Sequence, residues 1–234
     1  MDRSDAAGVR SGGRRLAVRL RKEFMTGLQV TVAGEVLQLL PERAVLWPAR
    51  RALMLADVHV GKVEAFQRHG VALPSEFGTA ELARLSNIVE REAVQAVWVL
   101  GDLLHTAVDS ELAPVASMLA RHRSVDFHLV LGNHDRRLRA PERLGLRVHS
   151  AAVPLGPFLL CHEPEPHPSH YVLAGHLHPM VQVRGPGDSL RLPCFQFQDA
   201  LGLLPAFTEF SGGVPVDRRQ GCTFAITEGE VVRV

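Results

Sequence analysis

The sequence predicts an α/β protein in which two β-sheets pack into a central sandwich and helices cover the outer faces. Up to residue 133, apolar runs of strand length alternate with helical patterns, which is typical of a sheet with covering helices. After Gly175 the chain is rich in short strand-like runs separated by turn residues. A sandwich of two sheets accommodates both halves of the chain.

The first structured elements are expected to be strands. Residues 1–24 are rich in Gly, Ser, Asp and Arg without a hydrophobic period, which predicts a flexible tail or an upstream extension of the gene start. Residues 25–234 are expected to form the domain. Within it, residues 28–32 and 35–39 are expected to pair across Ala33-Gly34, and residues 44–47 follow as a third strand.

Helices are expected to separate the next strands. Leu82, Leu85, Ile88 and Val89 recur at helical spacing, which predicts a helix within residues 76–94, and a second helix is expected over residues 114–122. Apolar runs of strand length cover residues 52–56, 97–100, 128–131, 158–160 and 171–174. Later strands are expected at residues 180–184, 189–192, 222–227 and 231–234.

The composition is that of a globular domain in a reducing compartment. The 234 residues are 46% hydrophobic and 22% charged, which is enough to bury a full core. No run approaches the roughly 18 apolar residues of a membrane span. The three cysteines form no C-x-x-C pair, and Arg19, Arg21 and Lys22 interrupt the apolar stretch that an export signal needs. We therefore expect a cytoplasmic protein with no membrane partner.

The most informative feature is that five of these apolar runs end in residue types that bind metals. In order, they lead into Asp57-Val58-His59, Gly101-Asp102, Gly132-Asn133-His134-Asp135, Cys161-His162 and Gly175-His176-Leu177-His178. Ligands of open α/β sheets gather outside the carboxyl ends of the strands, so these side chains are expected to meet at one rim. One such segment is a weak signal, but five in this order predict a metal site.

The residue types indicate which metals and which reaction the site would support. The candidate ligands are Asp57, His59, Asp102, Asn133, His162, His176 and His178. They are too many for one tetrahedral site and fit two sites that share Asp102. Nitrogen and oxygen ligands without thiolate favour Mn²⁺, Fe²⁺, Co²⁺ or Zn²⁺ over Ca²⁺. Two such cations activate a bridging water and hold a phosphoryl oxygen for in-line attack, which predicts phosphoester hydrolysis.

His134 is the candidate acid, because it lies between the candidate ligand Asn133 and the carboxylate of Asp135. We expect Asp135 to fix the tautomer of His134 and His134 to stabilise or protonate the leaving oxygen. The other interpretation gives His134 a structural hydrogen bond.

Further residues next to these segments are candidates for substrate contacts. We expect His105 to bind the substrate phosphate or to support the metal ligands, and Lys62 and Arg68 either to reach phosphate or to form surface salt bridges. A run of arginines follows His134: Arg136, Arg137, Arg139, Arg143 and Arg147. It either contacts a nucleic-acid backbone, Arg136 and Arg137 foremost, or forms a solvated face.

At these segments the chain resembles the calcineurin-like metallophosphoesterases, whose pattern is D-x-H, G-D, G-N-H-D, a lone H, and G-H-x-H. The resemblance implies a four-layer α/β/β/α sandwich. It also implies that one metal is held by Asp57, His59, Asp102 and His178, and the other by Asp102, Asn133, His162 and His176. His134 would act on the substrate.

Within that superfamily the chain is similar to the bacterial ligase-associated DNA damage response endonucleases. The similarity runs from Leu28 to Val234 and rests on Trp47-Pro48, A-D-V-H-V-G-K from Ala56, G-D-L-L-H from Gly101, H-E-P from His162, G-H-L-H-P from Gly175, L-P-C-F from Leu192 and L-P-A-F from Leu204. Gln67 and Leu104 depart from the subfamily pattern. The similarity implies an Mn²⁺-favouring phosphodiesterase that cuts single-stranded DNA and works beside a DNA ligase and a helicase.

Two other functions stay open on the residues alone. The same chemistry would serve a metallophosphatase or phosphodiesterase that acts on a nucleotide or a phosphoprotein. A non-catalytic scaffold of the same fold is disfavoured, because every candidate ligand and His134 are present.

Overall fold

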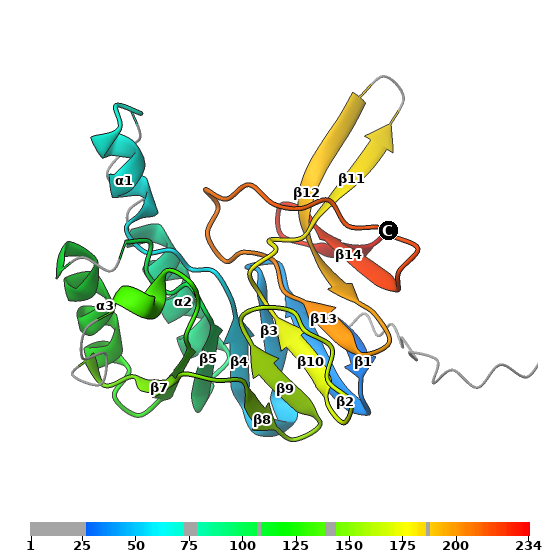
Figure 1. The fold of residues 1–234 in the computed structure, drawn as a ribbon, viewed down its shortest axis with the longest axis horizontal. Helices are drawn as coiled ribbons and strands as arrows, with labels where there is room; N and C mark the ends of the chain where they lie inside the picture. The colour runs from blue at the N-terminus through cyan, green and yellow to red at the C-terminus, as the bar shows by residue number, and fades with distance from the viewer. Residues whose placement is uncertain (1–26, 73–78, 107–108, 139–143, 186–187) are drawn as a thin grey trace, which may run out of the picture.

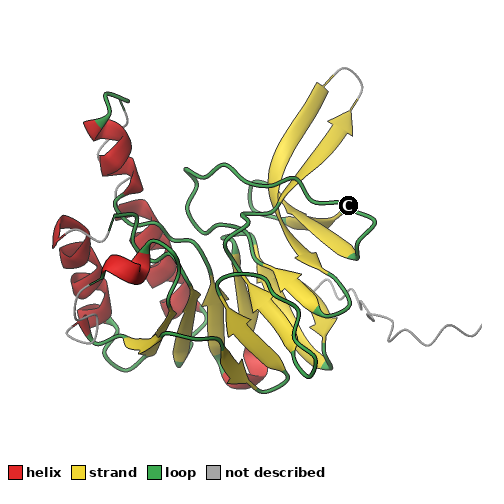
Figure 2. Ribbon diagram, viewed as in Figure 1, coloured by secondary structure: helices red, strands yellow, loops and turns green. Residues whose placement is uncertain are grey.

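The structure is a computed structural model that describes residues 27–72, 79–106, 109–138, 144–185 and 188–234. The predicted tail, residues 1–24, lies outside the described residues. The described chain forms two β-sheets packed face to face, with helices beside the first sheet (Figure 1 and Figure 2). Every helix in this described part is too short or too polar to traverse a lipid bilayer.

The first sheet has seven strands in chain order: β1 (Leu28–Val32), β2 (Glu35–Leu40), β3 (Ala44–Trp47), β4 (Ala52–Leu55), β5 (Ala96–Leu100), β6 (Asp126–Val130) and β7 (Arg147–His149). Strands β1 to β4 are antiparallel, and β4 to β7 are parallel. The predicted first hairpin is confirmed. Ala33 and Gly34 both have positive φ angles, +49° and +86°, which is the backbone of a two-residue hairpin turn.

Helices α2 (Ala80–Arg91) and α3 (Asp109–Arg121) cover the outer face of this sheet. The predicted stripe on α2 is confirmed, since Leu82, Leu85, Ile88 and Val89 are all buried. Helix α3 was predicted to begin at Pro114 but begins five residues earlier, at Asp109. Pro114 therefore lies inside the helix, where its lack of an N–H removes one backbone hydrogen bond. Helix α1 (Lys62–Arg68) was not predicted, because it is too short to show a period. A single 3₁₀ turn, η1 (Pro48–Arg50), joins β3 to β4.

The second sheet has the order β15-β14-β12-β13-β10-β9-β8, with β11 paired to β12. Its strands are β8 (Val153–Leu155), β9 (Phe158–Cys161), β10 (Tyr171–Ala174), β11 (Met180–Gly185), β12 (Asp188–Phe197), β13 (Leu201–Leu203), β14 (Cys222–Ile226) and β15 (Val231–Arg233). Strand β12 continues past the predicted end at residue 192. It pairs with β11 up to Pro193 and with β13 and β14 after it, so the proline lies where the strand changes partners. The short strands β7, β8 and β13 were not predicted from the sequence.

Two apolar cores hold the layers together. One lies between the first sheet and helices α2 and α3, and the other lies between the two sheets. Trp47 of β3 meets Phe158 of β9 edge to face in the inter-sheet core, with ring centroids 5.0 Å apart. The α/β class and the two-sheet sandwich are confirmed. The described residues from 144 onward contain no α-helix, because hairpins and loops connect the strands of the second sheet.

Candidate metal centre

All five predicted metal-binding segments follow the carboxyl ends of strands, three in the first sheet (β4, β5, β6) and two in the second (β9, β10). The loops after β4 and β5 continue side by side, since the backbone N–H groups of Asp57 and His59 donate to the carbonyls of Gly101 and Asp102. The second sheet joins them through His176, whose backbone N–H donates to Oδ2 of Asp57 at 2.9 Å. The predicted common rim is therefore present.

Asp57, His59 and His178 form one group of converging side chains. Nε2 of His178 lies 3.3 Å from Oδ1 of Asp57, and this carboxylate is fully buried. Oδ1 of Asp57 and both ring nitrogens of His59 make no hydrogen bond, although they are buried. Burial, helped by the charge of Lys62, lowers the pKa of His59 to about 2. His59 is therefore neutral near pH 7, which is the form that binds metals.

Asp57, Asp102 and His162 form a second group. Nε2 of His162 lies 3.5 Å from Oδ2 of Asp102 and 3.1 Å from Nδ1 of His176. The other ring nitrogen of His162, Nδ1, lies 3.0 Å from the carbonyl of Leu100 and donates to it. This bond puts the proton of the ring on Nδ1, so the Nε2 lone pair faces the group, as in many histidine ligands.

The backbone at these positions is strained. Asp57, His59, Asp102, His176 and His178 have φ angles of +57°, +50°, +52°, +68° and +47°. Residues other than glycine adopt this left-handed region at a cost, and such residues concentrate at functional sites. The strain gathers at the residues that the sequence selects as ligands.

Two glycines of the metal-binding segments allow the loops to approach closely. A Cβ atom at Gly101 would overlap the ring of His162, and one at Gly132 would overlap the carboxylate of Asp102. Gly101 also has a φ of +85°. These glycines let the loops that follow β5 and β6 lie against His162 and Asp102, two members of the second group.

The residues present fit divalent cations. Buried polar atoms without a hydrogen-bond partner are rare in proteins. Oδ1 of Asp57 and Nε2 of His59 are two such atoms, and their side chains belong to one group of possible metal ligands. Neutral imidazoles and carboxylates without thiolate suit the borderline transition metals. Asn133 is exposed in the turn after β6, and its place among the ligands stays a prediction.

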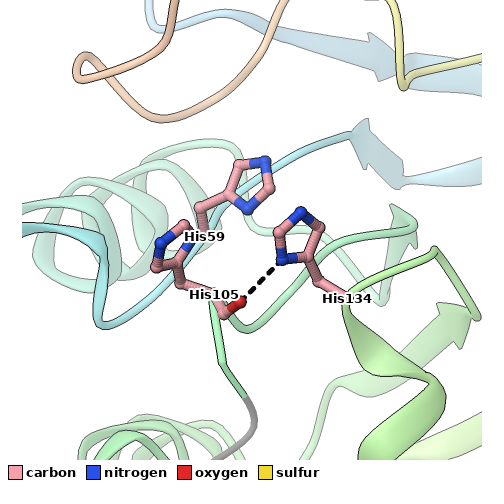
Figure 3. A group of neighbouring side chains, drawn as sticks. All are labelled: His59, His105 and His134. Atoms are coloured by element: carbon pink, nitrogen blue, oxygen red, sulfur yellow. Dashed lines mark hydrogen bonds between the residues drawn. The ribbon is translucent and has the colours of Figure 1, made fainter. Parts of the chain in front are cut away.

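His134 stands beside these groups with His105 and His59 (Figure 3). Its backbone N–H donates to Oδ1 of Asp102 at 2.9 Å, and its Nδ1 lies 2.6 Å from the carbonyl of His105. Because that carbonyl can only accept, Nδ1 carries the proton. Nε2 of His134 is 4.0 Å from Oδ2 of Asp102, so it faces the candidate ligands.

The predicted role of Asp135 is corrected. Its carboxylate is buried and accepts the backbone N–H groups of Gly132, Leu103 and Leu104 at 3.1, 3.4 and 3.2 Å, so it does not orient His134. The carbonyl of His105 takes that position instead. Burial raises the pKa of Asp135, and the three N–H bonds oppose this shift. Asp135 ties the loop after β6 to the loop after β5.

A strap segment, residues 206–213, crosses from the second sheet to the first beside this centre. Its Thr208 N–H donates to the backbone carbonyl of Asp57 at 3.2 Å, and Gly212 accepts a bond from Nδ1 of His178 at 3.1 Å. Thr208 also donates its hydroxyl to Glu81 of α2 at 3.0 Å. The strap therefore orients His178, and no sequence motif predicted it.

The candidate substrate residues lie in different settings. Lys62 is half-buried, and its burial lowers its pKa while Asp57 and Asp102 oppose this shift. Arg68 is exposed on α1, and Arg136 is exposed in the 3₁₀ turn η3 (Asp135–Arg137), 3.8 Å from Glu163.

The arginine run that follows His134 does not gather as a whole at the centre. Arg137 lies in η3, and Arg139 and Arg143 fall outside the described residues. Arg147 is at the amino end of β7, where it pairs with Asp126 at 2.8 Å. Of the two alternatives for this run, the position of Arg147 favours the solvated face, because the centre lies at the carboxyl ends of the strands.

The comparisons with known proteins agree with this geometry. Residues 50–161 match the family model described as calcineurin-like phosphoesterase. The chain is similar to the crystal structure of Pseudomonas putida nuclease MPE, with 37% identity and a TM-score of 0.77, over 88% of this chain and 98% of that one. No curated protein matches the chain significantly. By its fold, its motifs and this similarity, the chain belongs to the calcineurin-like phosphoesterase family and is a metal-dependent phosphoesterase.

Proposed function

We propose that this phosphoesterase is a nuclease that hydrolyses phosphodiester bonds in single-stranded DNA, with Mn²⁺ as the preferred metal. The observation that carries the proposal is the similarity to a protein described as a nuclease, which extends over 88% of this chain and 98% of that chain. The subfamily resemblance supports the same substrate. On this basis the protein would act in the cytoplasm in DNA repair, beside a DNA ligase and a helicase.

The metal would be held as a pair of cations. Asp57, His59, Asp102 and His178 would hold one cation, and Asp102, Asn133, His162 and His176 would hold the other. The converging buried donors without hydrogen-bond partners support this assignment. Bound cations of this kind supply an activated water and positive charge for the phosphoryl oxygens.

His134 would act on the leaving oxygen. Its Nδ1 keeps one proton on the carbonyl of His105, so His134 would donate as the imidazolium, giving the second proton, on Nε2, to the leaving oxygen. The side chain of His134 is 42% exposed, which leaves room for a substrate to reach it. The backbone bond to Asp102 holds the ring next to the proposed shared ligand.

The test compares substrates and metals on one purified protein. The protein is stripped with a chelator and then supplied with Mn²⁺, Mg²⁺, Zn²⁺, Fe²⁺ or Co²⁺. The substrates are an end-labelled single-stranded oligonucleotide, the same sequence as a duplex, a generic phosphodiester dye, a nucleotide and a phosphopeptide. The proposal predicts Mn²⁺-dependent cleavage of the single strand, with the duplex cut more slowly. Hydrolysis of the nucleotide or phosphopeptide without cleavage of the oligonucleotide would overturn it.

A further inference from the structure

The β11–β12 hairpin grows directly out of the rim of the metal centre. Strand β11 begins at Met180, two residues after the candidate ligand His178. The base of the hairpin is fixed there, because Met180 N–H donates to the carbonyl of Val214 at 2.9 Å and Cys194 N–H to that of Pro179 at 3.0 Å. Beyond this base the hairpin projects from the body of the second sheet (Figure 1). Its six-residue strand β11 extends about 20 Å at the usual rise per residue.

The two faces of the hairpin differ in chemistry. Gln182 pairs with Arg191 and Arg184 pairs with Ser189, and residues that pair across antiparallel strands lie on the same face. All four of these side chains are exposed. The opposite face carries Val181, Val183, Leu190 and Leu192, most of which pack into a small apolar cluster with Cys194 and Ala225. The hairpin therefore has one covered apolar face and one polar, basic face.

The polar face is the one on the side of the metal centre. The guanidinium of Arg191 donates to the carbonyl of Gly213 in the strap segment at 3.0 Å. The preceding residue, Gly212, accepts the bond from Nδ1 of His178. Arg191 thus contacts the residue that follows Gly212, and Gly212 orients the candidate ligand His178.

The charge of this face is available to a partner. In the described part of the chain no carboxylate pairs with Arg184 or Arg191, and Arg191 uses one of its several N–H groups for Gly213. The amide of Gln182 lies across the face, where it donates to Ser189 at 3.2 Å. Arginine guanidinium groups match phosphate oxygens geometrically, and amide and hydroxyl groups add neutral hydrogen bonds.

We propose that this face, Gln182, Arg184, Ser189 and Arg191, is an arm that binds the backbone phosphates of the nucleic-acid strand as it leaves the metal centre. This inference rests on the proposed nuclease function. When a nucleic-acid strand is cut at the rim, the phosphates next to the cut are expected to lie within reach of the arm. The contact is with phosphate, so it is independent of base sequence and weakens as salt rises.

The experiment measures binding separately from cleavage. Arg184→Ala is the main variant, because Arg184 is exposed and its loss leaves the Gly213 contact intact. The matched control is Arg121→Ala at the end of α3, which also removes one exposed arginine. The chain leads from there to the amino end of β6, whereas the metal centre lies at the carboxyl ends of the strands. Binding of a labelled 24-nucleotide single strand is measured without metal over a range of salt concentrations. Cleavage of that strand, of a dinucleotide and of a phosphodiester dye is measured with Mn²⁺.

The arm predicts that Arg184→Ala weakens binding of the long strand several-fold. It also predicts that the negative slope of log affinity against log salt becomes shallower by about 0.7, the value for one phosphate contact. Arg184→Lys should keep this slope. Hydrolysis of the dinucleotide and the dye should be unchanged in both variants. If Arg184→Ala binds the long strand as Arg121→Ala does while the wild type cleaves it, the arm is wrong and the nuclease function stands. If the wild type hydrolyses only the dye, the nuclease function fails, and unchanged binding in Arg184→Ala then also rejects the arm.

Discussion

The backbone N–H of His134 donates to Oδ1 of Asp102 over 2.9 Å, which ties the proposed acid to the proposed shared ligand. The other oxygen, Oδ2, lies 3.5 Å from Nε2 of His162 and 3.8 Å from Nε2 of His59. One carboxylate thus contacts the acid through one oxygen and both groups of candidate ligands through the other. This arrangement explains why Gly132, where a Cβ would overlap Asp102, precedes the acid in the sequence.

Asp102→Asn is expected to remove metal and activity together, because an amide cannot replace the negative charge shared by two cations. Bound metal per chain is measured by elemental analysis alongside turnover of a phosphodiester dye. Asp126→Asn is the matched control, since Asp126 pairs with Arg147 at the amino ends of β6 and β7, away from the metal centre. Wild-type metal content and activity in Asp102→Asn would reject the shared ligand.

His134→Ala is expected to retain metal while turnover of the oligonucleotide falls about 10²–10⁴-fold, the usual effect of a positioned acid or base. A dye with a phenol-like leaving group needs less protonation and should lose less activity. Metal content is measured on the same samples. Equal losses on both substrates would indicate charge stabilisation in place of proton transfer, and loss of metal would make His134 a ligand.

Arg136→Ala tests whether the 3₁₀ turn after the acid contacts the substrate strand. Arg136 is exposed, and its ion pair with Glu163 at 3.8 Å contributes little to stability. The variant should raise KM for an oligonucleotide and make the negative slope of log affinity against log salt shallower by about 0.7, while the dye is hydrolysed as before. An unchanged KM and slope would make this arginine part of a solvated face.

Gly101→Ala and Gly145→Ala separate backbone strain from close approach. Both glycines have similar φ angles, +85° and +81°, but a Cβ at Gly145 meets open space and one at Gly101 overlaps His162. Gly145→Ala should cost about 1–2 kcal/mol of stability from its backbone alone. Gly101→Ala should cost more and also lower metal content, as seen by thermal unfolding and elemental analysis. Equal effects of the two substitutions would show that the Gly101 contact is unimportant.

His128 predicts a stability loss in mild acid. Its ring stacks on Trp98 with centroids 3.8 Å apart, and Nδ1 lies 3.0 Å from Nε2 of His149, with Arg147 and Asp126 as the nearby charges. Burial, with the charges of His149 and Arg147, lowers the pKa of His128 to about 4. The unfolded chain therefore takes up the proton first, so stability present above the unfolded pKa of about 6.5 is lost as pH falls towards 4.

Denaturant unfolding between pH 7 and pH 4 measures this loss. His128→Phe keeps an aromatic ring on Trp98 and removes the titrating group, so its stability should fall less over this range. His167→Gln, in the loop after β9, serves as the control for the loss of an imidazole. If wild type and His128→Phe lose the same stability, His128 is not the group responsible.

Local patterns predicted much of the fold and the meeting of the metal-binding segments. The hairpin turn at Ala33-Gly34 and the stripe from Leu82 to Val89 are set by neighbouring residues, so the sequence reveals them directly. The common rim was predictable because it depends only on strands that end together. The assignment of each residue to a metal stays a prediction.

The errors and omissions concern partners that are distant in sequence. Asp135 was assigned to the adjacent His134, but its partners Leu103 and Leu104 lie 32 and 31 residues away. The strap contact to His178 spans 34 residues. The alternation of Gln182 and Arg184 with Val181 and Val183 is visible in the sequence, yet the direction of the polar face depends on the contact of Arg191 with Gly213.

An anomalous difference map, recorded at the manganese edge from crystals grown with Mn²⁺, shows directly whether the protein binds two cations that share Asp102. A shared two-cation centre predicts a pair of peaks, one bounded by Asp57, His59 and His178, and one bounded by Asp102, His162 and His176, with Asp102 touching both. A single peak, or peaks outside these two groups of side chains, would contradict a shared two-cation centre.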